Sequence, residues 1–351
     1  MVAVAVSAPL IQKKAEAQVP VAARASRAMP LRATLIGGLE VGLAGPPVVG
    51  ADGGWWLLGR DGEVERFGPD DSLKWSISIA ASINGASATD ESGRLVYIPT
   101  ARDLIVALDR DARVHWKYKA PAGVVGDVCW VPKQGLVFIG RDRLLYWLDL
   151  RANLVLRAPL KSAVTAGPAP FGNKVIVGTE DGQVLAFSRQ GTRQVMALEA
   201  PIRAIAPMSQ GGALVLAARV AHVLDATLSE QSSIPSALAI GVTASRGHAL
   251  KSTPLMLTES GELRGVEWAP AATAPTRDFL FAPALEATST AAWATDESGA
   301  LWQARPEPGW ERIQLGHAPL LRPVLDINRG RILVGSEGGS VWSVPVQANT
   351  E

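Results

Sequence analysis

Cysteine is almost absent from this sequence of 351 residues, in which Cys129 is the only one. A single cysteine excludes an internal disulfide, a pair of adjacent cysteines and a metal site built from several thiolates. Histidine is also rare, and the four histidines show no metal-ligand spacing: His115, His222, His248 and His317. We therefore predict no metal site, a small buried apolar role for Cys129, and structural roles for the histidines.

The sequence has no excess of charge and no long hydrophobic run. Lys and Arg total 34 against 33 for Asp and Glu, which gives a net charge of +1. Affinity for nucleic acid rests on clustered positive charge, so we expect no nucleic-acid partner. No segment approaches the roughly 18 continuous apolar residues of a transmembrane helix, so we expect no membrane span.

Common catalytic motifs are missing as well. The sequence contains no G-x-S-x-G nucleophile turn, no P-loop and no G-x-G-x-x-G dinucleotide motif. A Ser/His/Asp set that assembles only in the folded protein stays open at this point. We single out no catalytic residue and do not expect an enzyme.

Residues 1–31 differ from the rest of the chain, because they are rich in Ala and Val and contain no aromatic residue. An apolar stretch, Val2–Ile11, precedes Ala15–Ala17, which has the small-x-small form of an export cleavage site. In a signal peptide basic residues precede the apolar stretch, whereas two lysines follow it here. We interpret residues 1–31 as a flexible leader or the remnant of an export signal, and residues 32–351 as a single domain.

The sequence is rich in repeats. Pro46–Ile77 matches Ser87–Tyr118 through most of its length, and each copy reads as short strands separated by Gly/Asp turns. Such a period with several strands per copy predicts a β-propeller, because each copy forms a small sheet that buries its faces only against its neighbours. Eight copies have an equivalent central turn position, at a spacing of about 40 residues: Gly62, Asp103, Arg143, Gly182, Arg219, Gly261, Gly299 and Gly339.

The segment Gly178–Gly182, GTEDG, tests whether these turns carry chemistry. Its two acids beside two glycines could belong to a metal or phosphate site, but other copies read GRDG, GRDR and TESG. A catalytic loop would not exchange its acids for arginines around a ring, and no copy shows the alternating oxygen ligands of a calcium loop. We therefore predict hairpin turns between antiparallel strands, in which Gly supplies the positive φ.

We predict an all-β fold with eight four-stranded antiparallel blades. Seven blades are the alternative, if copies five and six are irregular. The last copy ends without its outermost strand, whereas the segment before the first copy, Arg32–Ile36, is strand-like and unassigned. We expect this N-terminal strand to complete the last blade and close the ring, since an open ring would expose strand edges.

The repeats resemble those of bacterial propellers with pyrroloquinoline-quinone-like repeats, the quinoprotein alcohol dehydrogenase-like group. The resemblance rests on Gly178–Ala186, on Ala107–Asp109 followed by Trp116, and on Trp75 at the matching place in the first copy. In that family the Ala and Trp of each copy interlock neighbouring sheets through their outer strands. The resemblance thus implies a set of blade-locking residues: Ala107, Asp109, Trp75, Trp116, Gly178, Gly182 and Ala186.

Some copies depart from this pattern. Leu156 and Val195 replace the Trp in copies three and four, where we expect looser interlocking. In copies five to seven the Ala is replaced by Val223, Gly265 and Gln303. The dehydrogenases of the family hold their quinone with a calcium site of Glu, Asn and Asp and with a disulfide of adjacent cysteines. This sequence has one cysteine and no recognisable counterpart of those ligands, so we expect no cofactor.

Charge on the central turns is uneven. These turns, which join the two middle strands of each blade, should lie on one face of the disc and form a rim. In blades one, two, three and five they carry Arg60, Arg102, Arg141, Arg143 and Arg219. In blades four, six, seven and eight they carry Glu180, Asp181, Glu259, Asp296, Glu297 and Glu337. We hypothesise that this rim, with one basic and one acidic arc, orients a protein partner. Ordinary solvated turn charges are the alternative.

Two functions remain open. The leading one is a non-catalytic scaffold that presents blade loops to an unidentified protein partner, as a monomeric domain within a larger complex. Such a scaffold is similar to the propeller lipoprotein of the outer-membrane protein assembly machine. This sequence departs from that lipoprotein, because it has no cysteine near its start. The family resemblance implies the periplasm or cell envelope, with the cytoplasm as the alternative.

The second function is a small-molecule-binding or enzymatic propeller with a site at the central channel. A funnel of polar side chains with perturbed titration would favour it. A channel plugged by Pro, Val and Ala from Pro46–Val49 and Ala166–Pro170 would favour the scaffold.

Overall fold

The computed structural model describes residues 32–208, 211–243, 254–265, 284–287, 291–296, 298–305 and 309–346. The chain divides into two compact units, Met1–Pro30 and Leu31–Glu351, and all described residues belong to the second. The leader predicted at residues 1–31 and His248 lie outside the described residues. The described part contains strands and no helix, and thus none long and apolar enough to cross a membrane.

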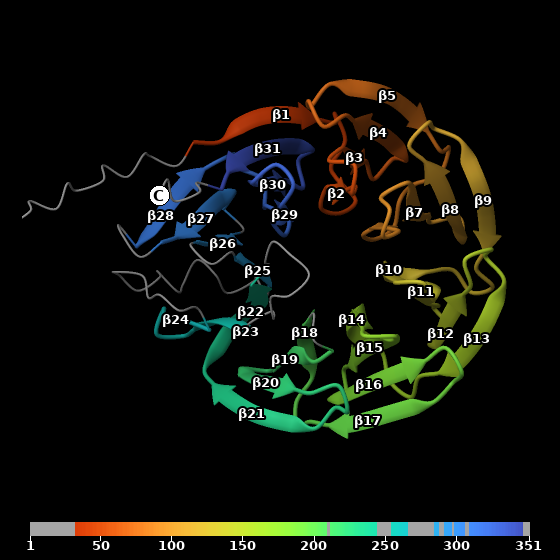
Figure 1. The fold of residues 1–351 in the computed structure, drawn as a ribbon, viewed down its shortest axis with the longest axis vertical. Coiled ribbons are helices and arrows are strands. Elements are labelled where there is room, and N and C mark those ends of the chain that lie inside the picture. The colour runs from red at the N-terminus through yellow and green to blue at the C-terminus, as the bar shows by residue number, and fades with distance from the viewer. Residues whose placement is uncertain are drawn as a thin grey trace, which may run out of the picture. The chain divides into compact units, whose positions relative to one another are not determined.

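The second unit is an eight-bladed β-propeller, whose blades follow one another around a ring in sequence order (Figure 1). Within each blade neighbouring strands pair antiparallel. Blade 1 contains β2 (Val48–Val49), β3 (Trp55–Leu58), β4 (Glu63–Phe67) and β5 (Leu73–Ser78). Blade 2 contains β6 (Ala88–Thr89), β7 (Leu95–Pro99), β8 (Leu104–Asp109) and β9 (Val114–Lys119). Blade 3 contains β10 (Val125–Val131), β11 (Gly135–Ile139), β12 (Leu144–Leu148) and β13 (Leu154–Pro159).

The remaining blades follow the same order. Blade 4 contains β14 (Val164–Phe171), β15 (Lys174–Thr179), β16 (Gln183–Ser188) and β17 (Arg193–Ala197). Blade 5 contains β18 (Ile202–Pro207), β19 (Ala213–Ala217), β20 (Val220–Leu224) and β21 (Glu230–Pro235). Blade 6 shows β22 (Ala237–Thr243), β23 (Pro254–Thr258) and β24 (Leu263–Arg264), and blade 7 contains β25 (Ala284–Ala287), β26 (Ala292–Thr295), β27 (Ala300–Ala304) and β28 (Trp310–Gln314). Blade 8 contains β29 (Val324–Asp326), β30 (Arg331–Gly335), β31 (Ser340–Pro345) and β1 (Thr34–Gly38).

Blades 6 and 7 depart from the regular pattern, because their innermost strands pair with each other. β22 runs parallel to β25, with Ile240 opposite Ala284 and Thr243 opposite Ala287. The two blades therefore form one seven-stranded sheet. They keep separate repeats, and the eight-blade prediction is confirmed over its seven-blade alternative.

The predicted closure by the N-terminal segment is confirmed. β1 pairs antiparallel with β31, with Thr34 opposite Ser343 and Gly38 opposite Ser340, so the strand lies two residues later than Arg32–Ile36. It also reaches blade 1, since a Cβ built on Gly37 would lie 3.2 Å from the rings of Trp55 and Phe67. β1 thus joins the last blade to the first.

The central turns have the backbone that the repeat predicts, with one exception. Seven of the eight predicted positions have positive φ: Gly62, Asp103, Arg143, Gly182, Gly261, Gly299 and Gly339. In blade 5 the residue with positive φ is Ala218 rather than Arg219, because β19 and β20 are joined by only two residues. The GTEDG segment is the predicted hairpin turn, between the antiparallel strands β15 and β16.

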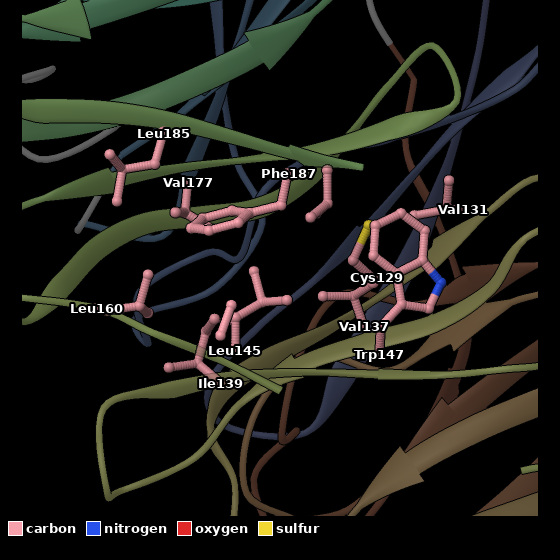
Figure 2. Packing of buried hydrophobic residues seen from close by; sticks show 12 residues of the cluster. Cys129, Val131, Val137, Ile139, Leu145, Trp147, Leu160, Val177, Leu185 and Phe187 are labelled. Carbon is pink, nitrogen blue, oxygen red and sulfur yellow. The ribbon is translucent and has the colours of Figure 1, made fainter. Parts of the chain in front are cut away.

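The core consists of apolar clusters between successive blades. Figure 2 shows the cluster to which blade 3 contributes Cys129 and Trp147, and blade 4 contributes Leu185 and Phe187. Burial raises the pKa of the Cys129 thiol to about 12, so that this side chain stays protonated at neutral pH. Its predicted role as a small buried apolar side chain is confirmed.

Candidate functional site

The predicted blade-locking residues of blades 1 and 2 meet at one turn. Trp75 Nε1 on β5 donates a hydrogen bond of 2.7 Å to the carbonyl oxygen of Arg110, in the turn between β8 and β9. Asp109 shapes this turn, because its Oδ1 accepts hydrogen bonds from the backbone N–H groups of Asp111 (2.9 Å) and Arg113 (2.8 Å). The outer strand of blade 1 is thereby attached to blade 2.

Trp116 takes part in an aromatic contact between blades 2 and 3. Its ring centroid lies 5.6 Å from that of Tyr97. The Tyr97 ring also stacks on that of Trp130 of β10, with 5.0 Å between the centroids. Ala107 is fully buried and stands opposite both Tyr97 and Trp116 in the sheet. A larger side chain at Ala107 would displace the two rings, because buried interiors are close-packed.

In blade 4 the predicted residues act through close packing. A Cβ on Gly178 would lie 2.3 Å from Ile202 Cγ2 of blade 5, so only glycine allows this approach. Gly182 has a φ of +82° in the central turn, and Ala186 is fully buried. Where the Trp is replaced, Leu156 still packs against the cluster between blades 3 and 4, whereas Val195 is 48% exposed. The looser interlocking of these copies stays a prediction.

The contact made by Trp75 can be tested by comparison with Trp116. We expect Trp75→Phe to lower the free energy of unfolding by about 1–2 kcal/mol, through loss of a hydrogen bond and some packing. Trp116→Phe is the matched control, since no hydrogen bond joins the Trp116 indole to a described residue. We expect its loss of unfolding free energy to be roughly 1 kcal/mol smaller than that of Trp75→Phe. Urea unfolding measures both, and equal losses would show that the bond to Arg110 contributes nothing.

The predicted rim arginines lie on the central turns, but three are paired with a carboxylate of the neighbouring blade. Arg60 Nη2 of blade 1 lies 3.6 Å from Glu337 Oε2 of blade 8. Arg141 Nη1 of blade 3 lies 3.9 Å from Asp103 Oδ1 of blade 2. Arg219 of blade 5 pairs with Glu259 of blade 6. The predicted separation into a basic and an acidic arc is therefore reduced by ion pairs between blades.

Two of the predicted rim arginines have no carboxylate partner among the described residues. Arg102 and Arg143, on the turns of blades 2 and 3, are exposed and form no ion pair with a described residue. In blade 4 Asp181 Oδ1 accepts a 2.5 Å hydrogen bond from the Thr179 hydroxyl, so this acid helps to shape its turn, and Glu180 beside it is exposed. Blades 2 and 3 therefore carry the basic charge of the rim that is free to meet a partner.

The structure also contains a buried charged network between blades 8 and 1. Arg331 is 5% exposed, and it donates from Nη1 to Asp71 Oδ2 (2.7 Å) and from Nε to Asp326 Oδ2 (2.9 Å). Asp71 Oδ1 accepts further hydrogen bonds from Arg329 Nη1 (2.8 Å) and Trp55 Nε1 (2.9 Å). Sequence reasoning missed this network, because a cation at the start of this strand is not unusual in the repeat: Lys174 begins the same strand in blade 4.

Sequence reasoning also missed a second buried cation, Arg66. It replaces the repeat's alanine in blade 1 and is 4% exposed. Its Nη2 donates to both carboxylate oxygens of Asp52 (2.8 and 2.7 Å), and its guanidinium lies 3.9 Å from the ring centroid of Trp56. Residue 54 has to be glycine, because a Cβ there would lie 2.4 Å from the Arg66 guanidinium. The Arg331 network joins blades 8 and 1, whereas the Arg66 network lies within blade 1, and both guanidinium groups are buried and paired.

The central channel contains an open cavity of about 1060 Å³ along blades 8, 1 and 2. Pro46–Val49, expected as a plug, lines this cavity, whereas Ala166–Pro170 does not. Glu91 in its lining already accepts hydrogen bonds from Trp130 Nε1 (2.9 Å) and Lys133 N (2.6 Å). Asp326 pairs with Arg331, and Asp90 caps its own turn. These carboxylates already serve the fold.

No metal site is apparent in the residues that the structure covers, where no group of three or more His, Cys, Asp or Glu side chains could hold an ion. His115 Nε2 lies 3.2 Å from Asp109 Oδ2, and His222 Nδ1 lies 3.0 Å from Glu230 Oε1. Each of these two histidines thus contacts one carboxylate of its own blade.

Comparisons with known proteins agree with this geometry. A search of curated proteins finds no match. Among solved structures, BamB from Moraxella catarrhalis is 14% identical and has a TM-score of 0.68, over 90% of this chain and 100% of its own. Virginiamycin B lyase from Staphylococcus aureus is 12% identical and has a TM-score of 0.58, over 90% of this chain and 99% of its own. At these identities the likeness shows the fold alone. The family model described as outer membrane protein assembly factor BamB matches residues 60–344, and the chain belongs to this family.

Proposed function

We propose that this protein is a non-catalytic scaffold of outer-membrane protein assembly, which binds a protein partner through the rim of its central turns. The observation that carries the proposal is the family match over residues 60–344. The name of that family refers to outer-membrane protein assembly, and from it we infer a place in the cell envelope.

The absence of catalysis is part of this proposal, since the similar fold of virginiamycin B lyase belongs to a protein named as an enzyme. Two features support a scaffold. The carboxylates Asp90, Glu91 and Asp326 of the channel are used by turns and neighbouring blades. The rim, by contrast, presents Arg102 and Arg143 to solvent.

Arg102 and Arg143 are the residues that we assign to the partner. They lie on neighbouring blades, on either side of the Arg141–Asp103 ion pair. Exposed charges of this kind attract an oppositely charged surface and raise the association rate more than they slow dissociation. The partner should therefore present acidic residues toward blades 2 and 3.

The test uses the tagged full-length chain in its native host, with captured proteins identified by mass spectrometry. We expect an outer-membrane assembly component among them, and its capture should fall about tenfold in the R102E/R143E variant. R60E/R219E is the matched control, because it makes the same change in charge at arginines already paired with Glu337 and Glu259. Equal capture by both variants, or capture of no assembly component, contradicts the proposal.

A further inference from the structure

The outer strands of blades 2, 3 and 4 carry an excess of positive charge that the balanced composition of the whole chain conceals. We call these strands, β9, β13 and β17, with the turn before and the loop after each, the basic flank: residues 110–124, 149–163 and 188–201. The basic flank contains nine Lys and Arg against three Asp and Glu. Corresponding segments elsewhere differ, since residues 68–83 of blade 1 have one Lys and two Asp. Residues 225–237 of blade 5 have two acids and no Lys or Arg.

These cations are accessible and uncompensated. Figure 1 shows β9, β13 and β17 one after another along the outer side of the ring, from yellow to light green. Eight of the nine cationic side chains are exposed, among them Lys117, Lys119, Arg157 and Arg193. None of the nine forms an ion pair with a described residue, in contrast to three of the five rim arginines.

The basic flank also exposes aliphatic side chains between its cations. Val114, Leu154 and Val195, one on each outer strand, are 45–48% exposed. Leu150, in the turn before β13, and Val155 are exposed as well. Five of the nine large hydrophobic residues exposed in the described part of the chain thus lie in these three segments.

This combination of groups decides the kind of partner. We propose that the basic flank binds the surface of an anionic phospholipid bilayer, with its cations on the headgroups and its aliphatic side chains among them. Anionic headgroups attract clustered Lys and Arg, and the boundary with the acyl chains accepts aliphatic side chains. A single-stranded nucleic acid would stack its bases on exposed aromatic rings, whereas Trp116 and Tyr118 of β9 are half-buried. A duplex would contact the cations through its phosphates and leave the exposed aliphatic side chains without an apolar partner, which a bilayer provides. The loops after these strands adjoin the rim, since Ala120 N and Leu160 N donate to the carbonyl oxygens of Asp103 and Arg143. The cations changed in the test below lie on the outer strands themselves and bind lipid rather than a protein, so the proposal does not depend on the proposed function.

The test measures binding of the full-length chain to vesicles by co-sedimentation. We expect binding to phosphatidylcholine vesicles in which about a third of the lipid is phosphatidylglycerol, and little binding to pure phosphatidylcholine. Binding should fall steeply from 0.1 to 1 M salt, because the screening length shortens from about 10 to about 3 Å. Wild-type protein that ignores anionic vesicles, or binds both kinds equally, overturns the proposal.

Charge reversal then locates the surface. K117E/R157E/R193E, with one change on each outer strand, should lower the vesicle partition coefficient about a hundredfold or more. R203E/R264E/R322E is the matched control, with the same change in charge at exposed arginines of blades 5, 6 and 8, and should stay within about threefold of wild type. Equal loss in both variants overturns the assignment to the basic flank, as does a flank that captures an acidic protein but no vesicles. If the reversal variant unfolds, K117Q/R157Q/R193Q provides the same comparison with a smaller change.

Discussion

Deleting residues 1–40 should lower the free energy of unfolding of the propeller by about 4 kcal/mol or more, through the burial lost with Ile36 and Leu39 and around them. The deletion removes β1, and with it the outer strand of blade 8. It also uncovers Trp55 and Phe67 of blade 1, which share a core cluster with Leu39. Urea unfolding followed by tryptophan fluorescence measures the effect.

A shorter deletion provides the control for this prediction. Removing residues 1–30 takes away the first compact unit and keeps β1, so we expect an unfolding midpoint equal to that of the full chain. A peptide of residues 32–40 should partly restore the stability of the longer deletion, because a ligand that binds only the folded state stabilises it. Full stability without residues 1–40 would show that the ring does not need this strand.

Asp71→Ala should be nearly as damaging, with a loss of about 3–5 kcal/mol, because it leaves a buried guanidinium short of a partner. Arg331 is 5% exposed, and its Nη1 has Asp71 as its acceptor. The double variant Asp71→Ala/Arg331→Met should lose less than the sum of the two single variants, since it removes the unpaired charge. Asp70→Ala is the matched control: this neighbouring carboxylate is exposed, and we expect little change.

The same network should make stability depend on pH in the acid range. Burial acts to raise the pKa of Asp71, but hydrogen bonds from Arg329, Trp55 and Arg331 outweigh it and hold this pKa below its ordinary value. The stabilisation is therefore complete above the unfolded pKa of about 3.9 and is lost as the pH falls through the lower folded pKa. The difference in unfolding free energy between wild type and Asp71→Asn should be large at pH 7 and narrow below about pH 4. A difference that is constant from pH 7 to pH 3 contradicts this account.

The fold could be predicted from the sequence because its repeat combines several local signals. Alternating strands recur at a period of about 40 residues, and a residue that tolerates positive φ, such as Gly182, stands at the same place in most copies. The missing strand of the last copy could be assigned to the N-terminus because a closed ring requires it. Blade 5 was the exception, since its two-residue turn shifts the positive φ to Ala218.

The charged groups could not be predicted in the same way, because their partners lie in other blades. Asp71 and Arg331 are 260 residues apart in the sequence and meet only when the ring closes. The rim was predicted as two arcs from the charge of each turn, whereas Arg60 and Arg219 are paired with neighbouring turns. The basic flank was missed because its cations are divided among three repeats, while the whole chain has a net charge of only +1.

The pairing of β1 with β31 has a consequence for how the protein is made. Residues 34–38 leave the ribosome before any of the blades, but their partners, residues 340–343, follow only after blades 1 to 7. Blades 1 to 7 can assemble as they emerge, because each is contiguous in the sequence, whereas blade 8 has to wait for the whole polypeptide. The newborn chain therefore carries an unpaired strand throughout translation, and completion of the toroid is the final step of its folding.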